Sequence, residues 1–231
     1  MCGRITLRSP ANSLIAMFDD LRSQQLVFPK FKPRYNICPT QSAIAVRESD
    51  SGEYEVAELR WGLVPFWSKD LKIGARMINA RSETVATKPA FRVAFKSRRC
   101  LILADGFYEW KKEGKSKQPF YISRTDDQPF CMAGLWESWT DKENPNAAPV
   151  ESCTVLTTDA NTIMQPLHDR MPVILEQQQF DFWLDKEFTD RETLEAALVP
   201  YASDELQTFP VDTIVNKASN DSPECIERLR E

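Results

Sequence analysis

Short apolar runs that recur between residues 43 and 158 limit the fold of this chain more than any other feature. Residues 43–48 (AIAVRE) and 54–61 (YEVAELRW) flank the turn-rich stretch SDSG and predict a hairpin. Further strand-like runs, each bounded by Gly, Pro, Asp or Asn, occur at residues 100–104, 120–124, 130–136 and 153–158. These runs alternate with loops more often than with long helices. We therefore expect an α+β fold with a mainly antiparallel sheet or irregular β-barrel core and peripheral helices.

Helical spacing of apolar residues is confined to a few segments. It predicts one amphipathic helix over residues 12–24, capped by Asn12 or Ser13, and two late helices over 175–185 and 190–198. Residues 27–42 contain three prolines and are expected to be extended or looped, and residues 141–152 to be a surface loop. We expect a single domain over residues 2–231, with a loosely attached tail from residue 215.

Composition excludes several classes of protein. The start lacks the apolar stretch of a secretory signal, and no run reaches the length of a membrane-spanning helix, so we expect a cytoplasmic protein without a membrane partner. The six cysteines are scattered, with no CxxC pair and no neighbouring histidine, at positions 2, 38, 100, 131, 153 and 225. This pattern predicts neither a zinc site nor disulfides in a reducing compartment, and we expect no metal or organic cofactor.

Charge is distributed unevenly along the chain. The formal net charge is −5, yet residues 69–124 hold 14 Lys and Arg against 5 Asp and Glu. Aromatic residues lie within or beside this basic stretch: Trp67, Phe91, Phe95, Phe107, Tyr108 and Trp110. Phosphate contacts combined with base stacking are typical of proteins that hold single-stranded nucleic acid. The alternative is a solvated basic surface without a partner.

Cys2 offers unusual chemistry if Met1 is removed, which the small residues that follow Met1 favour. An N-terminal cysteine carries an amine with a pKa of about 7.7 to 8.0 beside a thiol with a pKa of about 8.5, so both are nucleophilic near neutrality. The pair can close a thiazolidine on an aldehyde, or the thiolate can attack an acyl carbon. Alone, an accidental cysteine at position 2 would be the simpler explanation.

Other candidate groups are polar residues in apolar or proline-rich surroundings. His168 is the only histidine and lies between two prolines beside Asp169, a setting that suits a general acid or base. Residues 78–84 (INARSET) would place Asn79, Arg81 and Glu83 on one side of a strand. Glu109 follows the apolar run 100–104 and is a candidate proton shuttle.

Six motifs occur in an order that resembles the SOS response-associated peptidase (SRAP) family of abasic-site processing proteins. They are Met1-Cys2-Gly3-Arg4, Arg34-Tyr35-Asn36, WGLVPFW (61–67), INARSET (78–84), DGFYEWKK (105–112) and LHDRMP (167–172). The match runs from residue 2 to about residue 175. The resemblance implies the SRAP fold and covalent capture of abasic sites in single-stranded DNA, through a thiazolidine formed by Cys2 that protects the lesion during replication.

The resemblance also assigns roles to individual positions. Asn79 would orient the Cys2 amine or the sugar, Glu109 would relay protons, and His168 would promote sugar ring opening and reversal of the crosslink. The DNA-binding residues that it implies are Arg4, Arg81 and Arg170 at phosphates, Trp67 as a wedge or stacking platform, and Tyr35, Asn36, Lys88 and Thr157 in the groove. A monomer acting on single strands is expected, with single-strand/double-strand junctions at replication forks as an open alternative, and protein partners cannot be named.

Further activities and rival readings remain open. Associated lyase activity at the abasic site fits the resemblance, whereas we expect peptidase activity to be limited to self-processing. An N-terminal nucleophile amidohydrolase would use the Cys2 thiolate on a small amide, but it leaves the basic stretch and His168 unexplained. A non-covalent reader of modified bases or single strands would leave Cys2 without a role. Replacement of Cys2 by alanine separates these readings.

Overall fold

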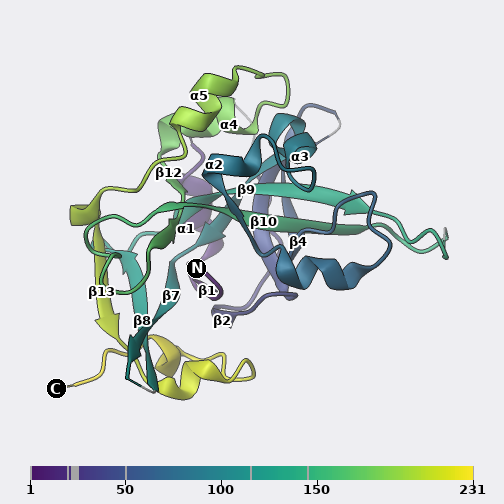
Figure 1. Cartoon of the computed structure of the whole chain (residues 1–231). Helices are drawn as coiled ribbons and strands as arrows, with labels where there is room; N and C mark the ends of the chain where they lie inside the picture. The colour runs from purple at the N-terminus through teal and green to yellow at the C-terminus, as the bar shows by residue number, and fades with distance from the viewer. Residues whose placement is uncertain are drawn as a thin grey trace.

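The strands form two sheets (Figure 1). The computed structural model describes residues 2–19, 21, 26–49, 51–114, 116–144 and 146–230, without the side chain of residue 113. The first sheet has the order β13-β8-β7-β1-β2, formed by β13 (Leu206–Pro210), β8 (Ser116–Arg124), β7 (Gly106–Glu113), β1 (Ile5–Leu7) and β2 (Arg34–Ile37). Its pairings are all antiparallel.

The second sheet contains the hairpin and the apolar strands expected from the sequence. Its order is β11 (Arg170–Pro172), β10 (Val150–Asp159), β4 (Tyr54–Trp61), β3 (Ser42–Glu48), β6 (Arg99–Ala104), β9 (Phe130–Trp139) and β12 (Ile174–Leu175), with β5 (Asn79–Arg81) paired to β10. β10 pairs with both β4 and β9, so β10, β4, β3, β6 and β9 form a ring. The predicted α+β fold with an irregular barrel is confirmed.

Burial explains why these segments form the ring. Every residue of β6 is buried, and β10 is buried from its third to its ninth residue, as expected for strands covered on both faces. The hairpin register pairs Ser42 with Arg60 and Glu48 with Tyr54. The predicted strands at 100–104, 120–124, 130–136 and 153–158 are therefore confirmed, each with one or more additional residues.

Helices are short and lie outside the ring (Figure 1). They are α1 (Ala11–Ala16), α2 (Ser82–Val85), α3 (Arg92–Ser97), α4 (Phe180–Leu184) and α5 (Arg191–Ala196), with 3-10 turns η1 (Leu71–Arg76), η2 (Gln177–Gln179), η3 (Ser203–Glu205), η4 (Thr213–Asn216) and η5 (Pro223–Ile226). The two late helices are confirmed in place, although both are shorter than expected. None of the helices within the described ranges is long and apolar enough to cross a membrane.

The first helix and the strand that holds Asn79 are both shorter than predicted. The helix expected over residues 12–24 ends at Ala16, and residues 20 and 22–25 of that prediction lie outside the described ranges. The N-cap of this helix is Pro10 without a side-chain bond, so neither Asn12 nor Ser13 caps it. A helix this short without a capping side chain depends on packing, which Leu14 supplies by its burial. The strand that holds Asn79 ends at Arg81, and Glu83 lies on α2 instead of continuing the strand.

The C-terminal segment (residues 211–229) packs against the first sheet, contrary to the prediction of a loosely attached tail. Val211, Val215 and Cys225 are buried and form an apolar cluster with Tyr108 and Tyr121 of the first sheet. Figure 1 shows this segment, in yellow, beneath the ends of β7 and β8 and close to β2. The chain end therefore covers the first sheet, where β1 and β7 lie side by side.

Candidate functional site

Cys2 lies three residues before the start of β1 and is fully buried. The Asn79 amide Nδ2 donates a hydrogen bond to the Cys2 carbonyl oxygen over 2.8 Å, which joins the start of the chain to β5. The other end of the same amide, Oδ1 of Asn79, is buried and has no hydrogen-bond partner among the described residues. A buried acceptor without a donor is costly, so the Asn79 side chain has unused bonding capacity beside Cys2.

Glu109 is buried on β7, in register with Phe120 of β8. The pKa of the Cys2 thiol is raised far above its ordinary value, first by burial and then by the negative charge of Glu109. While Met1 precedes Cys2, the thiol is therefore protonated at neutral pH and no reactive thiolate is present.

An open cleft of about 480 Å³ lies beside these residues. It is lined by Arg4, Glu109, Trp110, Lys117, His168 and Asn216. The structure thus brings together three of the predicted site residues, Arg4, Glu109 and His168, from β7 and from loops far apart in the sequence. Cys2 is connected to this group through Glu109, and Asn79 through its bond to Cys2.

His168 is partly exposed, and its two ring nitrogens have different surroundings. The backbone N–H of Arg170 donates to Nδ1 of His168 over 3.0 Å, and Oδ1 of Asp169 lies 2.7 Å from the same nitrogen. One nitrogen cannot accept from the amide and donate to the carboxylate at once, so protonation of Nδ1 selects between these two contacts. Neither of these two contacts involves Nε2.

Arg4 is half-buried and held in place by carbonyl and amide oxygens. Its guanidinium donates to Oδ1 of Asn36 over 2.7 Å and to the carbonyl oxygens of Val215 and Asn216. The same guanidinium lies 5.7 Å from the centre of the Trp110 ring. These bonds account for three of the five N–H donors of an arginine, and the rest can meet an anion in the cleft.

Asn36, next to Tyr35 on β2, accepts the hydrogen bond from Arg4 and supports that side chain from inside the protein. Asn36 is fully buried, and its amide Nδ2 lies within bonding distance of carbonyl oxygens of the C-terminal segment, the closest being that of Asn220 at 2.6 Å. The Tyr35 carbonyl accepts a hydrogen bond from the Tyr108 hydroxyl over 2.6 Å. The predicted contact of Asn36 with DNA in the groove does not fit this geometry, because its side-chain amide forms its hydrogen bonds inside the protein.

Arg170 and Thr157 are also buried. The Arg170 guanidinium forms a two-pronged ion pair with Glu83 and a second ion pair with Asp159, and it donates to the Thr157 carbonyl oxygen. The Thr157 side chain is fully buried and donates to the Ala80 carbonyl oxygen over 3.4 Å. Neither side chain can contact a phosphate without rearrangement. The structure makes them internal supports, in contrast to the roles expected from the sequence.

Trp67, Arg81 and Lys88 are exposed, as residues that contact a ligand on the surface must be. Trp67 is 44% exposed and its neighbour Phe66 is 51% exposed. The segment that carries both turns sharply at Gly62, whose φ of +126° and approach to the Gly74 carbonyl exclude a larger residue. None of the three lines the cleft.

Three residues that line the cleft were not among the sequence candidates: Trp110, Lys117 and Asn216. Trp110 was noted only as one of the aromatic residues of the basic stretch, although its place next to Glu109 could have identified it. Lys117 lies opposite Lys112 on the β7–β8 hairpin, a pairing that the turn between these strands determines. Asn216 had no local signal, because only the path of the C-terminal segment brings it to the cleft. Within the described ranges, no group of three His, Cys, Asp or Glu side chains could hold a metal ion.

Comparison with known proteins gives a consistent family assignment. Residues 1–218 match the family described as SOS response associated peptidase (SRAP). The Bacillus subtilis protein named Abasic site processing protein YoqW is 42% identical over 228 residues, covering 98% of this chain and 99% of that protein. The Xenopus tropicalis protein named Abasic site processing protein HMCES is 33% identical over 227 residues, covering 85% of this chain and 66% of the relative.

Solved structures share the same architecture. A protein from Bacteroides thetaiotaomicron superposes with a TM-score of 0.84 at 24% identity, covering 99% of this chain and 100% of the other. A phage-related protein from Bordetella bronchiseptica has a TM-score of 0.71 at 28% identity, covering 91% of this chain and 94% of the other. The arrangement of the two sheets is therefore shared among these proteins.

Proposed function

Because the chain belongs to the SOS response-associated peptidase (SRAP) family, we propose that it processes abasic sites in DNA by capturing them covalently through Cys2. The observation that supports the mechanism is a series of contacts: Asn79 bonds to Cys2, Cys2 interacts with Glu109, and Glu109 lines one cleft together with His168. The substrate is a single strand bearing the lesion, bound by a monomer. Relatives named abasic site processing proteins support the class of substrate.

The reaction begins with the amine of Cys2 once Met1 has been removed. The amine attacks the aldehyde carbon of the ring-opened sugar, and a proton moves from nitrogen to oxygen to give a carbinolamine. Loss of water leaves an imine, to which the thiol adds its sulfur at carbon and its proton at nitrogen. One molecule of water is released and nothing is oxidised. In the proposed order the amine attacks first, because burial of Cys2 and the negative charge of Glu109 both disfavour a thiolate.

Two titratable residues serve the proton transfers. Glu109 is buried beside Cys2, where it accepts the proton of the attacking amine and returns it to the departing hydroxyl. His168 lines the same cleft and uses Nε2 on the ring oxygen of the sugar, opening the ring and later promoting reversal. Asn79 bonds to the Cys2 carbonyl, and its unpaired Oδ1 is available to the new amine.

The exposed residues bind the strand on either side of the lesion. Arg81 and Lys88 meet phosphates, Trp67 stacks on a base or wedges at a bend, and Arg4 reaches a phosphate from inside the cleft. Stacking and phosphate contacts hold a strand without reading its sequence. Peptidase activity is confined to self-processing, and a lyase side reaction at the abasic site follows from the same imine.

The proposal is tested by denaturing gel electrophoresis of protein lacking Met1, incubated with a single-stranded oligonucleotide that carries one abasic site. We expect a heat-stable shifted band that requires both the lesion and Cys2. The matched control is Cys131→Ala, since Cys131 is an equally buried cysteine with no proposed part in the reaction. A band of equal intensity with Cys2→Ala, or no band with correctly processed protein, would rule out capture through Cys2.

A further inference from the structure

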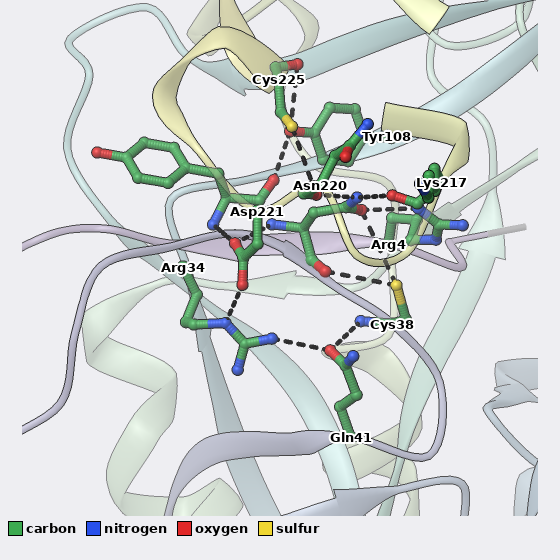
Figure 2. Close-up of polar contacts among 11 residues, drawn as sticks. Arg4, Arg34, Cys38, Gln41, Tyr108, Lys217, Asn220, Asp221 and Cys225 are labelled. Atoms are coloured by element: carbon green, nitrogen blue, oxygen red, sulfur yellow. Dashed lines mark hydrogen bonds and ion pairs between the residues drawn. The ribbon is translucent and has the colours of Figure 1, made fainter. Parts of the chain in front are cut away.

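The C-terminal segment (residues 211–229) is bound to the first sheet by polar contacts as well as by its apolar cluster. Asp221 forms an ion pair with Arg34 and accepts hydrogen bonds from the backbone N–H groups of Tyr35 and Asn36. Figure 2 shows these contacts together with Asn220 and Lys217, whose carbonyl oxygens face the Asn36 amide. The segment therefore has a fixed path from β2 to the cleft.

Asn216 is the point at which this segment reaches the cleft. Its Oδ1 accepts a hydrogen bond from the Trp110 indole Nε1 over 2.6 Å, and its carbonyl oxygen accepts one from Arg4 over 3.1 Å. Because an indole N–H can only donate, the first bond fixes the orientation of the amide. The Nδ2 group of Asn216 consequently points away from Trp110 and has no bonded partner among the described residues.

We propose that Asn216 is a positioning residue for DNA binding, which holds Arg4 and Trp110 in the orientation that receives the strand. Arg4 keeps free N–H donors for a phosphate, Trp110 presents its ring to a base or sugar, and the Asn216 amide adds a donor between them. The C-terminal segment is thus part of the binding site. This inference rests on the proposed function, because it concerns how the same cleft binds its DNA.

The exposure of Asn216 distinguishes a role in positioning DNA-binding side chains from a role in stabilising the fold. Asn216 is exposed, whereas the neighbouring Val215 is fully buried and packs in the apolar cluster. Shortening the Asn216 side chain therefore leaves the apolar cluster and the carbonyl bond to Arg4 intact, and it removes the bond to Trp110. We expect the midpoint of thermal unfolding of Asn216→Ala to stay close to that of the wild type.

The experiment measures reversible binding of a single-stranded oligonucleotide with one abasic site, in a Cys2→Ala background that blocks capture. Asn216→Ala should weaken binding roughly three- to tenfold, the loss expected for one hydrogen bond and its alignment. Trp110→Phe keeps the ring but loses the N–H donor, and it should show a loss of similar size. The two losses should not add in the double variant, because both variants break the same bond. Ser219→Ala, an exposed change in the same segment, should bind like the background protein.

Capture kinetics with Cys2 in place provide the second readout. Asn216→Ala should raise the DNA concentration for half-maximal capture more than it lowers the maximal rate, since the reacting groups are untouched. Unchanged binding by Asn216→Ala, or losses that add fully with Trp110→Phe, would overturn the proposal. Weakened, non-additive binding in a protein that forms no covalent product would support the role of Asn216 and refute the capture chemistry alone.

Discussion

Arg170 distinguishes two accounts of the site, because the sequence predicts that it binds a phosphate and the structure shows it paired inside the protein. A phosphate contact would make Arg170 important for affinity and neutral for stability. The structure instead buries its guanidinium, with 7% of the side chain exposed, between Glu83, Asp159 and the Thr157 carbonyl. We predict that Arg170→Met lowers the free energy of unfolding and leaves the electrostatic contribution to DNA binding nearly unchanged.

The size of the effect follows from the partners that would be left behind. The Glu83 and Asp159 side chains are 50% and 81% exposed, so both can be rehydrated, and each ion pair contributes about 0.5 to 1 kcal/mol. The buried Thr157 carbonyl loses a charged donor, which costs about 1 to 3 kcal/mol. The sum is about 3 kcal/mol, equivalent to a fall of about 6 to 12 °C in the unfolding midpoint for a chain of this size.

The assay combines thermal unfolding with DNA binding at several salt concentrations. At a temperature where the variant is folded, the slope of log affinity against log salt should match that of the wild type. Loss of one phosphate contact to a single strand would reduce that slope by about 0.7. A reduced slope together with an unchanged unfolding midpoint would refute the internal role of Arg170. Arg81→Met is the matched comparison, because Arg81 is exposed and should show the reduced slope.

Three further predictions concern the backbone, the exposed aromatic surface and the buried thiols. Gly62→Ala should destabilise the protein by about 2 to 3 kcal/mol in chemical denaturation. The reason is that φ at Gly62 is +126° and the new Cβ would lie 2.6 Å from the Gly74 carbonyl oxygen. The control Gly114→Ala, which has no atom within 4 Å of its Cβ, should lower the stability less. Trp67→Ala should weaken binding of a single strand about tenfold without changing the unfolding midpoint, since an exposed ring that stacks on a base contributes about 1 to 3 kcal/mol; equal affinity would exclude stacking by Trp67. Burial raises the pKa of the Cys131 thiol, so its contribution to stability is complete below about pH 8.5 and is lost as the pH rises. Between pH 8 and pH 10 the wild type should therefore lose about 2 kcal/mol more than Cys131→Ala, and parallel pH profiles would contradict this reasoning.

Local patterns predicted the parts of the fold that depend on local interactions. The hairpin of β3 and β4 and the apolar strands β6, β9 and β10 follow from runs of residues that suit a buried, pleated surface. The ring could only be expected as an irregular barrel, because it depends on β10 pairing with β4 and β9 at once. The prediction of a long first helix was wrong, because the helical spacing of apolar residues does not show where the packing that stabilises a helix ends.

The candidate site divides in the same way. Motifs singled out Cys2, Asn79, Glu109 and His168 as candidates; Glu109 and His168 line one cleft, Cys2 interacts with Glu109, and Asn79 bonds to Cys2. Motifs could not distinguish an arginine that faces solvent from one that pairs with carboxylates, which is why Arg170 was assigned to a phosphate. Such pairing joins residues that are 87 positions apart in the case of Glu83.

The C-terminal segment shows the limit of composition as a guide. Its polar sequence after residue 215 suggested a loose end, yet its carbonyl groups are the acceptors for Arg4 and Asn36. Every residue has a backbone carbonyl group, so no pattern of residue types predicts which carbonyl oxygens will accept these hydrogen bonds. Only the folded path of the segment shows that the chain end completes the cleft.

The central claim, that both nucleophilic groups of Cys2 take part in capture, is tested most directly by mass spectrometry of the N-terminal peptide. The crosslinked protein would be digested with nuclease and protease after treatment with borohydride, which reduces an imine but leaves a thiazolidine intact. We predict a peptide that begins at Cys2 and carries the sugar remnant less one molecule of water, with no added hydrogen. An adduct on a lysine, or an adduct at Cys2 that gains two hydrogen atoms, would contradict the account.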